Sequence, residues 1–494
     1  MGVSAKNIQQ VGKIFKNLKG NVITLDKNVL LNKKHIHFIG IGGSGMYPLA
    51  QILHSKGYYL TGSDNNETAT LQAVRDMGIP VFLGQRAENI EGADLIVYSA
   101  AIMSDNPELI AAKNSDAVVL ERSDLLGLVT SWYDNAVCVC GTHGKTTASS
   151  MLTTVFMEEG IDISCVIGGK LKSIGGSGRA GKSDTMICEA CEYVDTFLRL
   201  YPDIAVILNV DADHLEYFKN LDNIKKSFNK FASMATKCLV VNGDDKNTLD
   251  AIEGLDKEVI TFGFDRKNDF SGEIVSVNGM KTEFNLYIKG EFERKLTIFV
   301  PGVHNVLNAL ATVATAVRCG VSLDGIEMGL QVFRGAVRRF ERIDEVKGIT
   351  IVDDYAHHPK ELEVTLSAAK KLGYKRVWAV FQPFTYSRTS ILLDDFVKAL
   401  EIADKVVLTD IMGSREKNTL KIYTEDLGKK IDGAVWFDYD KDVVDAQTAQ
   451  QKNKNFTDIV EYLKKNLAEG DLVITLGCGD VYKLAVQLAN ELKV

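Results

Sequence analysis

The stretch "CVCGTHGKTTASSM", residues 138–151, has the composition of a phosphate-binding loop but not its usual spacing. The common P-loop has the form G-x-x-x-x-G-K-[ST], in which the Lys reaches the terminal phosphates and the hydroxyl holds Mg²⁺. Gly144, Lys145 and Thr146 are in place, but Val139 occupies the position of the first glycine and Gly141 lies only three residues before Gly144. The stretch is either a nucleotide loop of a different family or an ordinary strand-to-helix turn.

The residues on either side of the loop favour a nucleotide site. The apolar run "AVCVC" before it predicts a strand, and "TTASSMLTTVFM" after it predicts a helix. A helix N-terminus presents unpaired N–H groups and the positive end of the helix dipole, and both attract anions. Lys145 would add a charge there and Thr146 a hydroxyl for a metal ion.

Apolar runs alternate with helical patterns along most of the chain, which is typical of βαβ units around parallel sheets. The exception is the region 258–300, whose short runs predict antiparallel strands, followed by a helix with Pro301 near its start. The glycine-rich segment 168–184 predicts a polar surface loop. We therefore predict an α/β protein of three domains: a Rossmann-like domain, a central P-loop ATPase-type domain with a mixed sheet, and a second Rossmann-like domain. Their predicted bounds are 31–131, 132–335 and 336–494, after an N-terminal extension, 1–30.

Bulk composition narrows the functional classes. The 494 residues are 46% apolar and 25% charged, as in globular proteins, and the net charge of −8 argues against binding to nucleic acid or to an anionic membrane. No apolar stretch approaches the ~18 residues of a membrane span, and no signal peptide is recognisable. We therefore expect a cytoplasmic protein without membrane insertion. The eight cysteines fit free thiols, and the Cys188/Cys191 pair is better explained by burial than by zinc or redox chemistry.

Polar side chains follow the next two predicted strands of the central region. Glu189 and Glu192 come after "TMIC", and Asp213 and His214 come after "AVILNVDA". Because parallel strands end at one edge of a sheet, these side chains can converge on the loop. Oxygen ligands suit Mg²⁺, so Thr146 and Glu189 are good candidates, whereas His214 is a less expected ligand.

Two further patterns admit more than one interpretation. Asn305 and Asn308 share a helix face and could bind an adenine edge, or they could simply be a polar helix start. The motif Gly40-x-Gly42-x-x-Gly45 follows a predicted strand, and Asp64 lies 22 residues after Gly42. That pattern fits NAD, but it requires only a diphosphate on a helix N-terminus and a carboxylate near a ribose, which a UDP-sugar also provides.

Seven motifs between residues 35 and 485 resemble those of the Mur ligases of peptidoglycan synthesis and follow one another in that family's order. They are "GTHGKTT", the Glu after the second strand, "NVDADHLEYF", "GVHNVLNALA", "FRGAVRRFE", "DDYAHHP" and "FQPFTYSRT". The resemblance implies an enzyme, an ATP-dependent carboxylate–amine ligase that uses Mg²⁺ and acts on small molecules. It is closest to the branch that joins L-alanine to UDP-N-acetylmuramate, with a related peptide-recycling ligase as the alternative within the family. A P-loop switch without ligase chemistry is the alternative outside it, and a monomer or homodimer is expected.

The resemblance also assigns site residues, with Lys145, Glu189 and His214 as the catalytic group. The predicted ATP site comprises Gly141, Thr142, His143, Gly144, Lys145, Thr146, Thr147, Asn305, Asn308, Arg339 and Asp354. The predicted Mg²⁺ ligands are Thr146, Glu189 and His214. The predicted uridine diphosphate site comprises Gly42, Gly43, Ser44, Gly45, Ser63 and Asp64. The predicted amino-acid site comprises Tyr355, His357 and Arg388.

The chain departs from the common family pattern at a few positions. Thr385 stands where many members carry a second Arg, and Cys191 stands where an Asp is frequent, which leaves Glu192 as the second carboxylate. Some sister ligases carry a carbamylated Lys, but the equivalent position here falls near Phe228 or Asn229, so we predict no carbamate.

Overall fold

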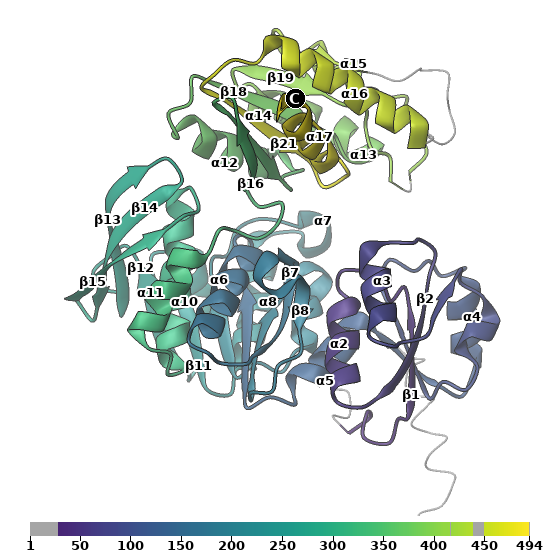
Figure 1. The fold of residues 1–494 in the computed structure, drawn as a ribbon. Coiled ribbons are helices and arrows are strands. Elements are labelled where there is room, and N and C mark those ends of the chain that lie inside the picture. Colours follow the sequence, from purple (N-terminus) through teal and green to yellow (C-terminus); the bar gives the residue numbers. More distant parts are fainter. Residues whose placement is uncertain (1–27, 415, 438–448, 494) are drawn as a thin grey trace, which may run out of the picture. The chain divides into compact units, whose positions relative to one another are not determined.

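The computed structural model describes residues 28–414, 416–437 and 449–493 (Figure 1). Most of the predicted N-terminal extension, residues 1–27, lies outside the described part. The strands form three sheets, each built mainly from parallel pairs, and the predicted α/β class is confirmed. The chain divides into two compact units: the first two sheets lie almost entirely in the first unit, and the third sheet lies in the second. Among the helices that the structure describes, none has both the length and the apolar character needed to cross a membrane.

The first sheet has the strand order β3-β2-β1-β4-β5, and all its pairs are parallel. Its strands are β1 (His35–Ile39), β2 (Tyr59–Asp64), β3 (Val81–Leu83), β4 (Leu95–Tyr98) and β5 (Val118–Glu121). Its helices are α2 (Tyr47–Ser55), α3 (Ala69–Asp76), α4 (Pro107–Asn114) and α5 (Arg122–Thr130), with a short 3₁₀ turn η2 (Ala87–Ile90). The order reverses at β1, whose neighbours are β2 and β4, and ligands of such sheets bind at this reversal. The glycine-rich turn follows β1 directly.

The second sheet contains the loop that follows β6, and its order is β15-β14-β13-β12-β11-β10-β6-β9-β7-β8. Its strands are β6 (Asn135–Cys140), β7 (Ser164–Leu171), β8 (Gly176–Arg179), β9 (Thr185–Glu189), β10 (Ile204–Ile207), β11 (Cys238–Asn242), β12 (Glu258–Gly263), β13 (Phe270–Asn278), β14 (Lys281–Ile288) and β15 (Glu291–Ile298). Its helices are α6 (Lys145–Glu158), α7 (Leu215–Phe218), α8 (Leu221–Ser233), α9 (Lys246–Ile252), α10 (Val303–Arg318) and α11 (Leu323–Val332), with 3₁₀ turns η3 (Lys172–Ile174) and η4 (Tyr193–Arg199).

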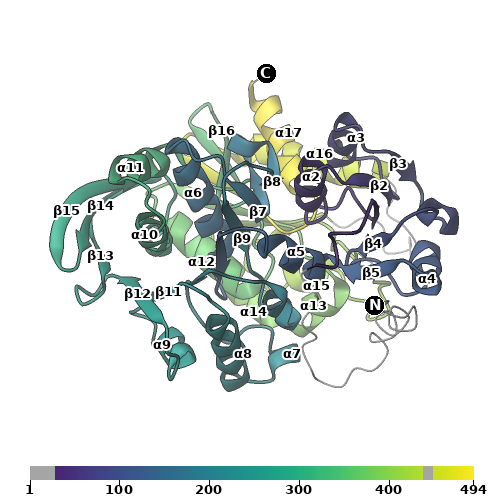
Figure 2. The same cartoon turned by 90° about the horizontal axis from the view of Figure 1, so that it is seen from below.

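Helices α6 and α11 lie side by side in both views of the fold (Figures 1 and 2). Gly329 permits this approach, because a Cβ there would come within 2.5 Å of the Val155 Cα. The close packing fixes the helix that follows the loop. The predicted helix after Pro301 is confirmed as α10.

Two sequence predictions for this sheet are wrong. The segment 168–184 is not a surface loop: β7 and β8 pair antiparallel, and the Gly176–Gly178 backbone is buried. Strand β12 pairs parallel with β11, although the sequence predicted antiparallel strands from residue 258. Strands β14 and β15 do form the predicted kind of hairpin, since Lys289 and Gly290 both have positive φ, 50° and 85°, as a tight two-residue hairpin turn requires.

The third sheet has the order β16-β17-β21-β18-β19-β20, and only the β16–β17 pair is antiparallel. Its strands are β16 (Glu341–Val346), β17 (Ile349–Asp354), β18 (Arg376–Phe381), β19 (Lys405–Leu408), β20 (Val435–Trp436) and β21 (Asp471–Leu476). Its helices are α12 (Pro359–Lys370), α13 (Tyr386–Ile391), α14 (Leu393–Leu400), α15 (Thr424–Gly428), α16 (Ala449–Asn466) and α17 (Tyr482–Lys493). Two apolar clusters cover the two faces of this sheet.

Candidate active site

The loop after β6 requires glycine at two positions. Gly141 has a φ of 142°, and Gly144, the residue before α6, has a φ of 84°. A Cβ on Gly144 would lie 2.6 Å from Oδ1 of Asn308, so a side chain is excluded by space as well as by conformation. The first N–H groups of α6 have no partner within the helix. The loop therefore offers backbone donors to an anion, as the sequence predicted for a phosphate site.

Lys145 folds back over this loop. Its ammonium donates to the carbonyls of Gly141 and Thr142, at 2.6 and 3.0 Å, and to Glu192 Oε1 at 3.0 Å. Burial by itself would lower the pKa of Lys145, but the charges of Glu192, Cys191 and Glu189 raise it above its ordinary value. The side chain therefore stays cationic at the N-terminus of α6.

Asn209 fixes the outer part of the loop. Its Oδ1 accepts from the His143 N–H at 2.8 Å, its Nδ2 donates to the His143 carbonyl at 3.0 Å, and its own carbonyl accepts from the Thr142 N–H. Asn209 is not among the site residues predicted from the sequence. Its position directly after the apolar run of β10, at the strand ends where Glu189 and His214 were predicted, could have indicated it.

The predicted carboxylates do meet the loop lysine. Glu192 is 3% exposed and ion-pairs with Lys145 at 2.9 Å, while Glu189 lies close enough to raise the pKa of Lys145. Glu189 Oε2 accepts from the Gly168 N–H at 2.7 Å. Within the described part of the chain its Oε1 has no hydrogen-bond partner, as a carboxylate ligand of Mg²⁺ requires.

The other two predicted metal ligands sit at neighbouring elements. Thr146 is 6% exposed in the first turn of α6. His214 adopts a left-handed φ of 52°, and its ring lies 4.7 Å from that of Tyr193. Among the described residues no three His, Cys, Asp or Glu side chains form a group that could hold a metal by themselves. Mg²⁺ commonly takes part of its shell from phosphate and water, so a small protein set is enough for it, and the set Thr146, Glu189 and His214 stays a prediction.

Asn305 and Asn308 lie beside the phosphate loop rather than at a distance from it. Both are buried, and Asn308 Nδ2 donates to Asn305 Oδ1 at 3.0 Å. The contact of Asn308 with Gly144 places this pair against the N-terminus of α6. Its predicted role at the adenine edge remains a prediction.

The glycine-rich turn after β1 packs closely against Asp64 and Arg122. Gly40 has a φ of 85°, and the Gly42 N–H donates to Asp64 Oδ2 at 3.1 Å. A Cβ on Gly42 would lie 2.9 Å from the same oxygen, and one on Gly45 would meet Arg122 at 3.0 Å. Gly43 and Ser44 lie between these contacts. The turn and Asp64 therefore form one unit, and its predicted role as a uridine diphosphate site stays a prediction.

Ser63 differs from the other residues predicted to bind uridine diphosphate. Its side chain is fully buried, and its hydroxyl donates to Glu108 at 2.5 Å. The second oxygen of Glu108 lies 3.1 Å from Nε2 of the buried His37. Ser63 therefore supports the turn from below, with its carbonyl accepting from the Gly40 N–H. Sequence spacing could not reveal this buried network, because its side-chain bonds join residues 45 and 71 positions apart.

In the third-sheet unit, adjacent arginines have different surroundings. Arg338 ion-pairs with the buried Asp353 at 2.9 Å and donates to the Gly479 carbonyl, so internal contacts occupy it. Arg339, the predicted phosphate ligand, lies over the ring of Tyr355 at 5.4 Å. Because Arg338 is committed to the fold, Arg339 is the better candidate for a ligand.

The predicted amino-acid site groups around α13. Among the residues that the structure describes, Arg388 Nη1 is buried without a hydrogen-bond partner, which fits an anionic ligand. Burial lowers the pKa of His357, whose Nδ1 lies 3.1 Å from the Tyr355 carbonyl. Thr385, which departs from the family pattern, has a φ of 63° and accepts the Arg388 N–H as the cap of α13. Its hydroxyl thus orients the helix that carries Arg388.

Burial raises the pKa of Asp354 to about 6, against an opposing effect of Arg339. Asp354 accepts the N–H groups of Phe340 and Ala356 at 2.7 and 2.8 Å. The folded state keeps its proton to a higher pH than the unfolded state does, so this group destabilises the fold as pH rises from about 4 to about 6.

We expect Asp354→Asn to remove that pH dependence. A pKa shift of about two units corresponds to about 3 kcal/mol. The free energy of unfolding of the wild type, measured relative to that of the variant, should therefore fall by up to this amount between pH 4 and pH 7. Denaturant unfolding of both proteins across this range measures the difference. A constant difference would contradict the assignment.

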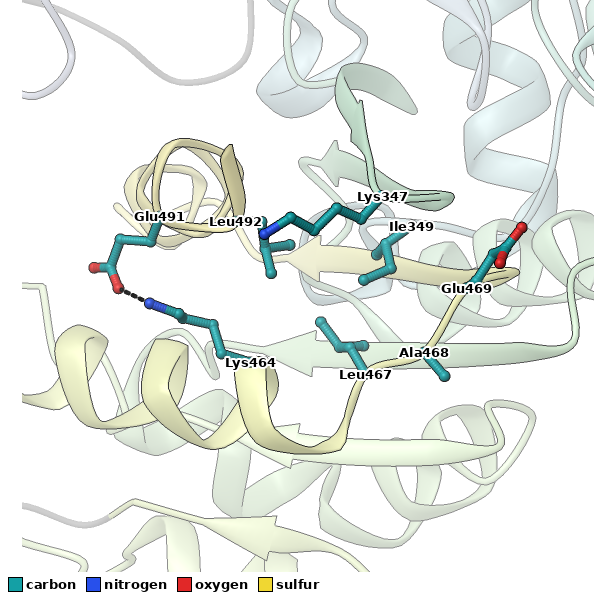
Figure 3. A pocket seen from close by; sticks show the side chains of 8 residues that line it. All are labelled: Lys347, Ile349, Lys464, Leu467, Ala468, Glu469, Glu491 and Leu492. Carbon is teal, nitrogen blue, oxygen red and sulfur yellow. Dashed lines mark hydrogen bonds and ion pairs between the residues drawn. The ribbon is translucent and has the colours of Figure 1, made fainter. Parts of the chain in front are cut away.

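Two surface pockets, one in each unit, are lined by none of these residues. Figure 3 shows a pocket of about 400 Å³ between the β16–β17 turn and the last two helices, where Lys464 Nζ lies 3.1 Å from Glu491 Oε2. A second pocket, of about 340 Å³, is lined by Lys33 and residues 90–94 and 115–117. The candidate site is therefore defined by loops and strand ends and not by either pocket.

Comparison with known proteins agrees with this arrangement. Three family models match consecutive parts of the chain: "Mur ligase family, catalytic domain" over residues 35–133, "Mur ligase middle domain" over 139–316 and "Mur ligase, glutamate ligase domain" over 338–479. A UDP-N-acetylmuramate–L-alanine ligase from Caldanaerobacter subterraneus is 43% identical over 93% of this chain and 98% of the relative.

Two solved structures extend the likeness to the fold. The UDP-N-acetylmuramate-alanine ligase of Thermotoga maritima superposes with a TM-score of 0.75 at 26% identity, over 93% of this chain and 99% of that one. A murein peptide ligase from Psychrobacter arcticus superposes with a TM-score of 0.67 at 23% identity, over 93% and 99% of the two chains, and shares the fold. Because it is 43% identical to the Caldanaerobacter ligase over 93% of its own length, this chain belongs to the Mur ligase family.

Proposed function

We propose that the protein joins L-alanine to the lactyl carboxylate of UDP-N-acetylmuramate, with conversion of ATP to ADP and phosphate. The observation that carries this function is the similarity, over nearly the whole of both chains, to a relative with that name. The enzyme is an ATP-dependent ligase. A cytoplasmic location and a monomeric or homodimeric state are further parts of the proposal.

The reaction proceeds in two substitutions. An oxygen of the lactyl carboxylate attacks the γ-phosphorus of ATP, the bond to the ADP oxygen breaks, and an acyl phosphate forms. The neutral amine of L-alanine then attacks the acyl carbonyl, phosphate leaves with the electrons of the C–O bond, and the nitrogen loses one proton to the solvent. The first step brings two anions together, so its barrier depends on the positive charge around them.

Residues of this chain would supply that charge. Lys145 and the N-terminus of α6 would bind the terminal phosphates, and Arg339 would be a further cationic ligand of the nucleotide. Mg²⁺ held by Thr146, Glu189 and His214 would add a Lewis acid to the phosphate oxygens. Asn305 and Asn308 would bind the adenine edge, and Asp354 would contribute to the same nucleotide site.

The two other substrates would use the remaining groups. The turn of Gly42, Gly43, Ser44 and Gly45 would bind the diphosphate of the UDP-sugar, with Asp64 at the ribose and Ser63 supporting the turn. Arg388 would pair with the alanine carboxylate, which a charge-assisted bond suits. Tyr355 and His357 would form the adjoining walls.

A substrate comparison tests this function. Purified enzyme receives ATP, Mg²⁺, UDP-N-acetylmuramate and either L-alanine or a tripeptide that begins with L-alanine, and ADP release is followed. We expect a higher kcat/KM with L-alanine. A higher value with the tripeptide would indicate the peptide ligase of the same family, and no release with either would contradict the ligase function itself.

A further inference from the structure

Residues 164–179 form a hairpin of β7, η3 and β8 that contacts both halves of the first unit; we refer to it as the bridging hairpin. Strand β7 pairs with β9, which ends at Glu189, and β8 is the edge strand of the second sheet. Both views place β8 beside α2, the helix that follows the glycine-rich turn (Figures 1 and 2). The proposed function leaves this hairpin without a role.

One side of the bridging hairpin is fixed to the proposed metal carboxylate. The Gly168 N–H donates to Glu189 Oε2, and a Cβ on Gly168 would lie 2.2 Å from Glu189 Oε1. The carboxylate therefore rests directly on the backbone of β7, and any displacement of β7 would displace the carboxylate with it.

The other side is fixed to the proposed diphosphate turn. The Ser177 hydroxyl, on a residue 4% exposed, donates to the Ser44 carbonyl at 2.7 Å. A Cβ on Gly178 would lie 2.2 Å from Pro48 Cβ and 2.9 Å from the Cys165 carbonyl. The glycine is needed here for close approach, since its φ is not in the left-handed region. The hydrogen bond from Ser177 thus holds the turn against β8, and the tight contact between Gly178 and Pro48 holds the start of α2 there.

We propose that Ser177 and Gly178 are positioning residues for the ligation, and this inference rests on the proposed function. They hold the UDP-binding turn at a fixed place relative to Glu189 and Lys145, so that the lactyl carboxylate meets the γ-phosphate. Reacting atoms must approach to about 3–3.5 Å, and a misplacement of about 1 Å can lower the rate about 10²-fold. Neither residue needs to touch a substrate for this effect.

The test is Gly178→Ala, whose added methyl group forces α2 and the turn away from β8. We expect kcat for alanine-dependent ADP release to fall about 10- to 10²-fold. The affinities for UDP and for a non-hydrolysable ATP analogue, measured by calorimetry, should stay within about twofold, because each half of the site keeps its own geometry. Gly176→Ala is the matched control on the same strand, since its Cβ would meet only Tyr47 Cε1 at an ordinary 3.5 Å.

Ser177→Ala provides a second, milder variant that decides the matter if Gly178→Ala does not fold. It removes only the hydroxyl bond to Ser44, and we expect a several-fold fall in kcat with unchanged UDP affinity. Ser173→Ala, at an exposed position of η3, is its control. Pro48→Gly removes the two closest atoms that Gly178→Ala would strike and leaves the Cys165 carbonyl, so adding it to that variant should restore part of kcat.

Three outcomes separate this inference from the alternatives. If folded Ser177→Ala has the kcat of the wild type, the inference is overturned, whether or not Gly178→Ala does so too and even if the melting temperature falls. A loss of UDP affinity with unchanged kcat would also overturn it and would make the hairpin a binding element. If the wild type itself shows no alanine-dependent ADP release, the proposed function fails instead.

Discussion

Lys145→Ala is expected to release ADP about 10²–10³-fold more slowly than the wild type at saturating substrates. The ammonium is the cation that lies on the loop carbonyls at the N-terminus of α6, and the carboxylate of Glu192 keeps it charged. The ammonium stabilises the transition state more than the ground state, because negative charge accumulates between the lactyl carboxylate and the γ-phosphate. Because the effect is on the transition state, we expect kcat to fall more than the affinity for ATP.

A second variant separates this effect from a loss of folding. Lys145→Ala leaves Glu192 as a buried, unpaired carboxylate, and breaking such a pair costs about 3–5 kcal/mol of stability. The double variant Lys145→Ala/Glu192→Gln removes that charge. It should recover stability in denaturant unfolding without recovering kcat. A kcat within tenfold of the wild type in either variant would contradict the role of Lys145.

Arg388→Ala is expected to raise the KM for L-alanine about 10²-fold and to leave the KM for ATP unchanged. Its Nη1 is buried and has no hydrogen-bond partner in the described part of the chain, so a buried donor is present where the alanine carboxylate is proposed to bind. Removing one partner of a buried charged pair costs about 2–5 kcal/mol. Steady-state kinetics with each substrate varied in turn measures the effect.

The control for Arg388 is an arginine of the same unit whose ion pair lies on the protein surface. Arg342 is half exposed and pairs with Glu345. Arg342→Ala should leave all three KM values unchanged, because exposed pairs contribute little. An Arg388→Ala enzyme with a KM for L-alanine within twofold of the wild type would mean that the carboxylate binds elsewhere.

The sequence predicted the loops that carry the chemistry better than the segments between them. Gly144, Lys145 and the glycine-rich turn stand at fixed spacings from a strand and a helix, and local periodicity is enough to place them. The segment 168–184 was mistaken for a loop because glycine and polar residues are typical of loops. Its glycines serve instead to admit Pro48 and Glu189, which are distant in sequence.

The amino-acid sequence by itself determined the α/β class, the position of each strand-to-helix turn that bears a site residue, and the family. Those features depend on periodicity and spacing over a few residues, which a chain carries in its order alone. The tertiary structure alone decided that Lys145 pairs with Glu192, that Asn209 fixes the loop, and that Ser177 contacts Ser44. These contacts join residues 47 to 133 positions apart, and only strand order, register and close packing bring such residues together.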